Sequence, residues 1–409
     1  MRTWRGVSPT KRAKPSLIEG QFLKDVKVNR SNGPEPREPP VTLRTLFRSF
    51  VLILAGLAAA CGSEPGLDAQ GRAEEPAATA KPVPADARET RLRNVRQLTF
   101  GGENAEAYFD RTGTKLVFQS THGDMKADQI FVMNIDGSEM RRVSNGKGRT
   151  TCAYWFPDGS RIIYASTHGA EDEPAPPPDR SHGYVWKLYD TYDLWTVKPD
   201  GSDPQRLTTR VGYDAEATIA PDGSKIVYTS LRDDDVDLYL MNLDGTGERR
   251  VTTLPGYDGG AFFSEDSKRL IWRASRPSDD RQREDWRLLI EQGLVRPTAL
   301  DIYTADVDGR NVVQVTRNGR SNWAPFLHPD GERIIFCSNL GDPEGHRGQP
   351  NFDLWLINVD GTGLERVTYN ESFDGFAMFS PDGKKLVFCS NRHGSTPGET
   401  NVFIADWVD

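Results

Sequence analysis

The side chains best suited to chemistry occupy one recurring position of the chain. Seven residues before the proline of each repeated turn, or before the residue aligned with that proline, stands an acid, an amide or a hydroxyl: Asn104, Thr150, Asp214, Asp258, Asn322 and Asp374. If the repeated segments surround a common axis, these residues ring its mouth with oxygen ligands. Such a ring suits a hard cation such as Ca²⁺, which takes 6–8 oxygens. The candidate metal ligands are Asp214, Asp258, Asp374, Asn104 and Asn322.

A structural explanation of the same ring competes with metal binding. Short Asp and Asn side chains routinely cap their own turns and bond nearby backbone N–H groups. Positions that recur in a repeat more often serve the repeat than a ligand. We favour this explanation, so no cofactor is expected unless the ring takes Ca²⁺ in the central channel. Two residues further along, Glu106 and Glu216 are candidate ligand-binding residues on the same strands.

The turn that organises these residues is Pro-Asp-Gly. Proline presets φ, aspartate bonds its own backbone, and glycine accepts a positive φ. A short β-branched and aromatic run leaves each turn, and a third and a fourth short strand follow. The turns stand at residues 157–159, 221–223, 329–331 and 381–383, with degenerate copies at 110–113 and 265–267.

Four antiparallel strands repeated at intervals of roughly fifty residues are typical of the blades of a β-propeller. Six copies predict an all-β, six-bladed β-propeller over residues 95–409. The sixth copy stops after its third strand, at 401–406, while a spare fourth-strand phrase, Gln97-Leu98-Thr99, precedes the first copy. We therefore expect an N-terminal strand to complete the last blade and remove the exposed sheet edge.

The chain ahead of the repeats has a different composition. Residues 41–60 are predicted to be a lipoprotein signal peptide, because a short apolar run, 50–60, follows Arg44 and Arg48. This run is too short to span a bilayer as a mature helix. It ends at Cys61-Gly62, which resembles a bacterial lipobox and predicts Cys61 as the lipid attachment site. An ordinary signal peptide with an incidental cysteine is the alternative.

Two polar segments flank the predicted signal. Residues 1–40 are interrupted by proline and are predicted to be a disordered, mis-assigned upstream extension. Residues 61–94 are rich in Ala, Pro, Glu and Gly and are predicted to be a disordered tether. Gly62 after the cysteine resembles lipoproteins sent to the outer membrane, so we expect a location on its periplasmic side. The formal net charge of −8 argues against nucleic acid, whose phosphates need a basic surface.

Variable insertions stand at 167–191, 276–300 and 340–351, at the end of the blades opposite the Pro-Asp-Gly turns. Function usually lies on variable loops held by a rigid scaffold, so their aromatic residues Tyr184, Trp186 and Trp286 are candidate ligand-binding residues. Alternatively, the insertions only cap the channel and cover blade edges. The run 286–290 is predicted to form one or two helical turns.

The cysteines and histidines carry weaker signals. Cys337 and Cys389 hold equivalent positions of neighbouring copies, in a column that also contains Gln119, Ala165, Thr229 and Arg273. That separation is too large for a disulfide, so these thiols and that of Cys152 are predicted to be free and buried. The histidines His122, His168 and His393 lack the spacing of a metal motif.

Two phrases, residues 379–384 (Phe-Ser-Pro-Asp-Gly-Lys) and 356–361 (Leu-Ile-Asn-Val-Asp-Gly), resemble the repeats of the TolB propeller family. The resemblance covers about residues 95–409 and implies a periplasmic, six-bladed propeller. TolB also has a small α/β domain ahead of its propeller, where we expect only a tether here. The repeat also resembles the propellers of dipeptidyl-peptidase-class enzymes and of oligogalacturonate lyases.

The predicted function is that of a lipid-anchored, monomeric envelope propeller that acts as a non-enzymatic platform for protein interactions. Its partner would be an envelope protein or a cell-surface polymer, with membrane contact through the lipid anchor only. A glycan- or peptide-binding module at the channel mouth is the alternative. A metal-dependent lyase or hydrolase is the third reading, which no nucleophile–base pair in the sequence favours.

Overall fold

The computed structural model describes residues 80–346, 349–371 and 373–409. These residues belong to one compact unit formed by residues 66–409. The predicted extension at 1–40, the signal at 41–60, Cys61 and the tether as far as residue 79 lie outside the described residues. In the part of the chain that the structure describes, no helix has the length and apolar character to cross a bilayer.

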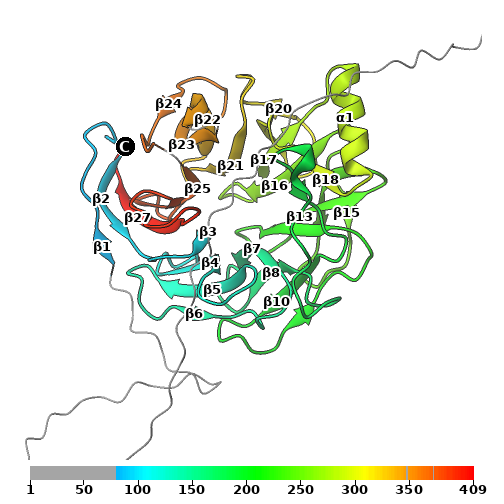
Figure 1. The fold of residues 1–409 in the computed structure, drawn as a ribbon, viewed down its shortest axis with the longest axis horizontal. Coiled ribbons are helices and arrows are strands. Elements are labelled where there is room, and N and C mark those ends of the chain that lie inside the picture. The colour runs from blue at the N-terminus through cyan, green and yellow to red at the C-terminus, as the bar shows by residue number, and fades with distance from the viewer. Residues whose placement is uncertain (1–79, 347–348, 372) are drawn as a thin grey trace, which may run out of the picture. The chain divides into compact units, whose positions relative to one another are not determined.

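The fold is an all-β propeller, in which antiparallel sheets follow one another around a common centre (Figure 1). In each sheet the innermost strand leads through a tight turn to its neighbour. The first two sheets contain β3 (Glu103–Phe109), β4 (Lys115–Thr121), β5 (Gln129–Asn134) and β6 (Arg141–Arg142), then β7 (Thr150–Trp155), β8 (Ile162–Ser166), β10 (Asp193–Val197) and β11 (Gln205–Arg206).

An eight-stranded sheet comes next, and a single parallel pair, Val236 with Tyr257, joins its two groups of four strands. Its groups are β12 (Asp214–Ile219), β13 (Ile226–Arg232), β14 (Asp235–Met241) and β15 (Arg249–Arg250), then β16 (Tyr257–Phe263), β17 (Arg269–Ser275), β19 (Asp301–Asp306) and β20 (Val313–Gln314). The last two sheets contain β21 (Asn322–Leu327), β22 (Arg333–His346), β23 (Gln349–Asn358) and β24 (Glu365–Arg366), then β25 (Asp374–Phe379), β26 (Lys385–Ser390) and β27 (Asn401–Trp407).

An N-terminal strand extends the last sheet. β2 (Leu92–Gln97) runs antiparallel to β27, with Leu92 opposite Trp407, and β1 (Lys81–Pro82) pairs with the outer side of β2. Residues 81–82 and 92–94 of the predicted tether therefore pair with the last sheet. The reason lies in contacts with the other end of the chain and with the core: Leu92 and Val95 are buried in the core, and the buried Glu89 pairs with Arg392 at 3.0 Å.

The two ends of each sheet differ. At one end the Pro-Asp-Gly turns close with a hydrogen bond from the fourth residue to the first, such as Gly383 N–H to Ser380 O at 2.8 Å. The degenerate turn keeps this geometry, because Ser267 takes the positive φ of 61° that glycine provides elsewhere. At the opposite end lie the insertions. We call these the turn face and the loop face.

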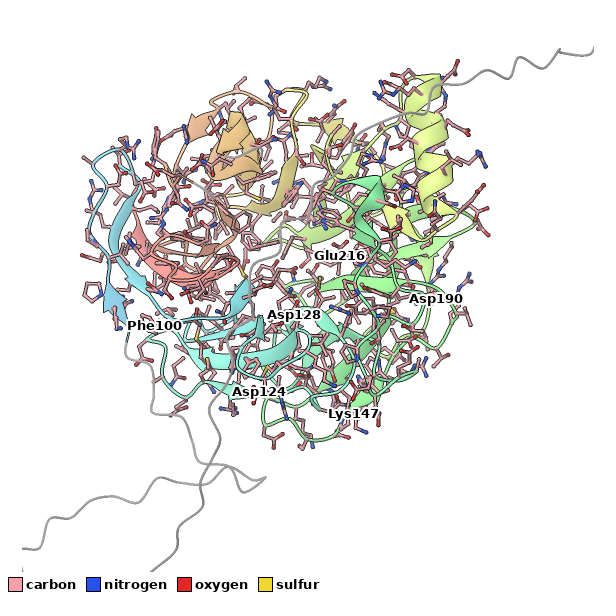
Figure 2. All side chains as sticks on the ribbon, in the orientation of Figure 1. Phe100, Asp124, Asp128, Lys147, Asp190 and Glu216 are labelled. Carbon is pink, nitrogen blue, oxygen red and sulfur yellow. The ribbon has the colours of Figure 1, made fainter. Side chains whose placement is uncertain are left out.

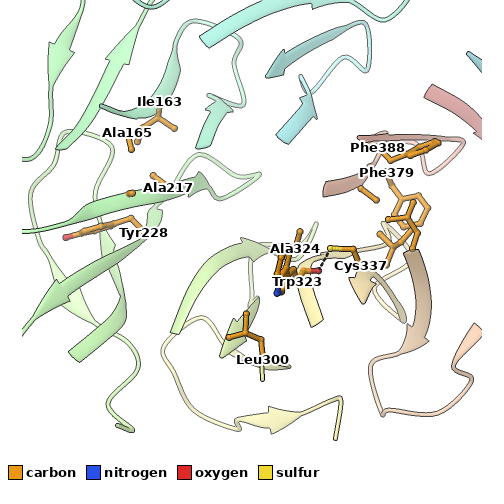
Figure 3. Close-up of a cluster of buried hydrophobic side chains, with 14 of the residues drawn as sticks. Ile163, Ala165, Ala217, Tyr228, Leu300, Trp323, Ala324, Cys337, Phe379 and Phe388 are labelled. Atoms are coloured by element: carbon orange, nitrogen blue, oxygen red, sulfur yellow. Dashed lines mark hydrogen bonds between the residues drawn. The ribbon is translucent and has the colours of Figure 1, made fainter. Parts of the chain in front are cut away.

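Apolar side chains between neighbouring sheets form the core, where Trp272, Tyr164 and Tyr228 are fully buried. Figure 3 shows part of it, including the contact between Cys337 Sγ and the Trp323 carbonyl oxygen at 3.5 Å. All three described cysteines are free, as predicted. Cys337 and Cys389 are buried, whereas Cys152 is only half-buried, so the prediction for that thiol was wrong.

Two insertions of the loop face pair with each other. β9 (Trp186–Lys187) and β18 (Leu294–Val295) form a two-stranded sheet, so the insertions of two non-adjacent copies meet. One also holds the 3₁₀ turn Arg180–His182, and the other holds α1 (Asp280–Ile290), which confirms the predicted helical segment. The Asp279 side chain caps α1 by accepting from the Gln282 N–H. We call residues 180–192 and 276–300 the canopy.

Candidate functional site

The six innermost strands, β3, β7, β12, β16, β21 and β25, each contain a β-bulge at the same position. The strand register shifts there, and the residue two places after the predicted ring position takes a left-handed φ of 43° to 61°. A bulge re-aims side chains locally, and bulges are frequent beside functional sites. These six residues line the narrow part of the central channel, and we call them the bulge column: Glu106, Cys152, Glu216, Gly260, Ala324 and Phe376.

The predicted ring of acids and amides, which we call the polar column, lies at the start of the same strands. All of its members are buried. Asp258 accepts hydrogen bonds from Arg276 at 2.5 Å and from the Trp272 indole at 2.6 Å. Asp374 pairs with Arg392 at 2.7 Å. Each of these carboxylates therefore pairs with an arginine from the segment that follows the next strand.

The rest of the polar column also bonds to its own surroundings. Asp214 accepts from Ser230 Oγ at 2.6 Å, and Arg232 lies 3.6 Å away. Asn104 donates to the Thr400 carbonyl at 2.8 Å, and Asn322 to the Leu300 carbonyl at 2.8 Å. Among the described residues, no three His, Cys, Asp or Glu side chains group as metal ligands. These contacts support the structural explanation of the polar column.

A cavity of about 600 Å³ lies between the bulge column and the canopy. Of the predicted ligand-binding residues, Tyr184, Trp186, Glu106 and Glu216 line it. Trp286 does not: it lies on α1 and packs against the apolar core. Of the six polar-column residues, only Asn104 reaches the cavity wall.

Aromatic rings form much of the cavity wall. Trp186 of the canopy meets Trp323 edge to face, with ring centroids 5.4 Å apart, and Tyr184 stacks on the same indole at 6.5 Å. Ser321 accepts the Trp323 indole N–H at 2.6 Å and fixes that ring. Further rings complete the wall: Tyr189, Tyr192, Tyr213, Tyr257, Phe373 and Phe376.

A buried ion pair forms part of the cavity floor. Arg273 of β17 contacts the Glu216 carboxylate and the Tyr257 hydroxyl, the latter at 2.9 Å. Thr229 donates to the same carboxylate at 2.8 Å. Gly260 makes room for this arginine, since a Cβ there would stand 1.9 Å from its guanidinium. In Figure 2, Glu216 lies nearer the centre of the ring of strands than the labelled residues at its periphery.

Glu106 is the second carboxyl group of the floor. Its one polar side-chain contact among the described residues is with Cys152 Sγ, at 3.7 Å. Burial, and then the neighbouring Glu216, raise the pKa of Glu106 to about 7. Burial and the same two carboxylates raise the pKa of the Cys152 thiol well above its usual range. The floor can therefore change its charge near neutral pH.

Below the bulge column, aromatic rings fill the channel. Phe262 contacts Tyr108, Tyr154 and Phe326 with centroid separations of 5.4, 5.9 and 5.3 Å. On the turn face, Arg111 and Glu265 form a bidentate ion pair, with nitrogen–oxygen distances of 2.8 and 2.7 Å. The spaces left at these levels are about 40 Å³ each. The large cavity therefore lies on the loop face.

Sequence reasoning missed the role of Arg273 and Cys152. Arg273 stood out only as the one cation in a column of Gln, Ala, Thr and Cys, which was a usable signal. His122 and His168 contact serines at the ends of their own strands, at 3.0 and 2.6 Å. No histidine of the described residues lines the cavity.

Comparisons with known proteins agree with the repeat pattern. No family model matches the chain. It is 34% identical to uncharacterized protein Atu1656 of Agrobacterium fabrum over 24% of this chain and 30% of that one. It is 29% identical to the TolB homolog of Chlorobium luteolum over 26% of this chain and 31% of that one. The matched segments thus span about three tenths of these relatives.

Among solved structures, a putative TolB from Agrobacterium tumefaciens aligns with a TM-score of 0.47 and 17% identity, covering 75% of this chain and 91% of that one. The chain also matches the Tol-Pal system protein TolB of Alcanivorax borkumensis in sequence. Together with the match to the Chlorobium luteolum protein, this similarity supports a TolB-like propeller family for the repeats.

Proposed function

We propose that this TolB-like propeller is a non-enzymatic binding platform of the cell envelope, and that it holds part of its partner in the loop-face cavity. The observation that carries the proposal is the aromatic-walled cavity of about 600 Å³. Ligand sites in proteins are commonly clefts of about 300–1,000 Å³ with apolar walls and a few convergent polar groups. The cavity has this size and this combination of groups.

Exposed apolar side chains on the loop face support a partner larger than a small molecule. They are Tyr184 of the cavity wall, at 55%, and Val211 at 85% and Leu254 at 57% on connections between the repeated segments. Exposed aromatic and aliphatic groups around a concave centre are typical of protein-interaction surfaces. A partner segment would enter the cavity while flanking parts contact these residues.

The proposal includes a six-bladed ring that β2 closes. The pairing of β2 with β27 supports closure, and the single parallel bridge between β14 and β16 supports counting the eight-stranded sheet as two blades. It also includes a lipid anchor at Cys61, on the periplasmic side of the outer membrane, with the propeller acting as a monomer. The sequence at Ala58-Ala59-Ala60-Cys61-Gly62 supports the anchor.

Affinity capture from solubilised envelopes tests the platform. The wild-type chain is compared with the double variant Tyr184→Ser/Trp186→Ala and with a control, Leu364→Ser. Leu364 is 45% exposed and lies on the turn face. We expect the cavity variant to lose the captured partner and the control to retain it, as quantified by mass spectrometry. Equal capture by all three proteins would overturn the proposal.

Palmitate labelling tests the anchor separately. We expect the full-length chain expressed in a Gram-negative host to incorporate label and to fractionate with the outer membrane. The Cys61→Ser variant should lose both properties. Label on neither protein would contradict the lipid anchor and leave the cavity proposal standing.

A glycan-binding module is the second candidate. The observation that favours it is the cluster of Tyr184, Trp186 and Trp323 rings above two carboxyl groups, because aromatic faces and carboxylates suit sugar rings and their hydroxyls. Sedimentation with purified peptidoglycan checks it. Retention by the polymer that disappears in Tyr184→Ser/Trp186→Ala would favour the glycan reading over a protein partner.

A further inference from the structure

The floor of the loop-face cavity carries a carboxylate that the described residues do not neutralise. Three charged side chains meet there: Glu106, Glu216 and Arg273. Arg273 forms its ion pair with Glu216 and donates a hydrogen bond to the Tyr257 hydroxyl. Glu106 makes no ion pair with any described residue, and its contact is with the Cys152 thiol. When Glu106 is ionised, the floor therefore holds one negative charge in excess.

The other basic groups of the cavity wall each donate a hydrogen bond to a carbonyl oxygen outside the wall. Arg149 donates from Nε to the Ala175 carbonyl at 2.8 Å, and Lys187 donates from Nζ to the Gln292 carbonyl at 2.5 Å. Both carbonyls belong to residues outside the cavity lining. The remaining wall acids are Asp128, which accepts from Thr121, and the exposed Glu103. None of these four side chains forms an ion pair with Glu106.

The aromatic walls are already used by cations within the protein. The Arg273 guanidinium lies 5.2 Å from the Trp186 ring centroid, and the Arg149 guanidinium lies 5.7 Å from that of Tyr189. Cations are attracted to ring faces at about this distance, and more strongly where water is excluded. A positive group entering this cavity would meet further rings, including Tyr213 and Phe376, as well as the free carboxylate.

We infer that the cavity selects a ligand with a primary ammonium or guanidinium group, such as a lysine or arginine side chain of the partner, and that Glu106 is its counter-ion. This inference rests on the proposed binding function of the same cavity. A neutral group of equal size would gain the apolar contacts but would leave the half-buried carboxylate uncompensated, and an anion would be repelled.

Cys152 offers a direct reading of the charge at the floor, because its thiol lies beside Glu106 and is partly exposed. Methanethiosulfonate reagents of similar size are used, one with a trimethylammonium group and one with a sulfonate. In each case the Cys152 thiolate forms a mixed disulfide and methanesulfinate leaves. Peptide mass spectrometry of the full-length chain separates Cys152 from Cys61. The ratio of the two rates cancels the thiolate fraction, which is common to both.

We expect the cationic reagent to react about tenfold faster than the anionic one, after correction for their rates with a free thiol. Glu106→Gln should remove most of this preference, whereas the control Glu103→Gln, at the exposed rim, should keep it. A ratio near one in the wild type, or a ratio unchanged by Glu106→Gln, would overturn the inference.

A matched pair of ligands gives the second measurement. Nα-acetyl-lysine amide and Nα-acetyl-norleucine amide have side chains of similar length. Only the lysine derivative carries an ammonium group at the end of its side chain. Titrations followed by NMR should show at least about tenfold tighter binding of the lysine derivative, lost in Glu106→Gln. Equal binding of both would refute the cation preference and leave cavity binding intact. If Tyr184→Ser/Trp186→Ala also leaves partner capture unchanged, the proposed function itself falls, and the reagent ratio still decides the charge preference.

Discussion

The polar column and the bulge column lie two residues apart on the same six strands, yet they behave differently. The polar column repeats an acid, amide or hydroxyl in every copy, and its buried groups bond to their own sheets or loops. The bulge column varies from Glu and Cys to Gly, Ala and Phe, and it faces the channel. The position that repeats thus makes contacts within the fold, whereas the position that varies lines the channel below the proposed site.

The largest expected effect tests the structural side of this comparison. Asp258→Ala leaves the part-buried Arg276 and the Trp272 indole without their acceptor. Removing one partner of a buried ion pair typically costs about 3–5 kcal/mol, and we expect a loss near the lower end in urea unfolding at pH 8. Burial raises the pKa of Asp258 to about 6, so the pair is charged at that pH.

The control for that experiment is Asp280→Ala, which removes a fully exposed carboxylate paired with Arg283 on α1. Its effect should stay below about 0.5 kcal/mol. If Asp258→Ala cost no more than this control, the polar column would not be the structural network described above.

The second prediction uses the pKa of Glu106, which is raised from 4.5 to about 7. A raised folded-state pKa means that this group's contribution to stability is full below the unfolded value and is lost as pH rises through about 7. Glu106→Gln removes a half-buried, desolvated charge, so it should stabilise the protein by about 2–3 kcal/mol at pH 8 and by under about 1 kcal/mol at pH 5. Urea unfolding at the two pH values measures this difference.

Other groups around Glu106 sharpen the same test. Glu216, Arg273, Cys152 and Asp128 all act on its charge, and each is kept in the Glu106→Gln variant. Glu216→Gln should instead lower the free energy of unfolding at pH 8, because it leaves the guanidinium of Arg273 without its carboxylate partner. Destabilisation by both substitutions would show that Glu106 is a structural acid like those of the polar column.

The third prediction concerns the space that Gly260 leaves for Arg273. Gly260→Ala places a Cβ at a φ of 61° and within 1.9 Å of the guanidinium, so the arginine must move. We expect a loss of about 2 kcal/mol and weaker partner capture. Ala324→Gly is the matched change in the opposite direction at the equivalent position. Because Ala324 has a positive φ of 43°, which glycine adopts more easily, this variant should be as stable as the wild type or slightly more stable. Thermal melting and capture of both variants check the pair.

The smallest expected effect is that of Ca²⁺. The arginines beside Asp214, Asp258 and Asp374 supply the positive charge that a cation would bring. We therefore expect the melting temperature of the wild type to be the same in excess Ca²⁺ and in a chelator. The variant in which all three aspartates are replaced by Asn should melt at a lower temperature, and that temperature should also be unaffected by Ca²⁺. Stabilisation by Ca²⁺ that the triple variant abolishes would return the metal site to the polar column.

The fold could be predicted because its signals are local and repeated. Each Pro-Asp-Gly turn fixes a hairpin by itself, and the spare phrase at 97–99 pointed to the strand that extends the last sheet. The candidate site was predicted in part: four of its five proposed ligand-binding residues line the cavity. Trp286 was misplaced because its helix packs the aromatic ring onto the core.

The remainder of the site depends on features that the sequence conceals. Left-handed residues are usually signalled by glycine, but only Gly260 of the bulge column is one, so the bulges were not visible. The pairing of Glu216 with Arg273 joins two copies, and that of β9 with β18 joins two insertions. Contacts of this kind depend on how blades are arranged in space, which local patterns do not specify.

The central claim is that the partner binds at the loop face and not at the turn face. Site-specific photo-crosslinking in intact envelopes tests this claim most directly. Benzoylphenylalanine is placed at Tyr184, on the cavity rim, or at Leu364, on the turn face, and the two residues are 55% and 45% exposed. We predict a discrete crosslinked partner from position 184 and none from position 364. The same partner crosslinked from position 364 alone would contradict the account.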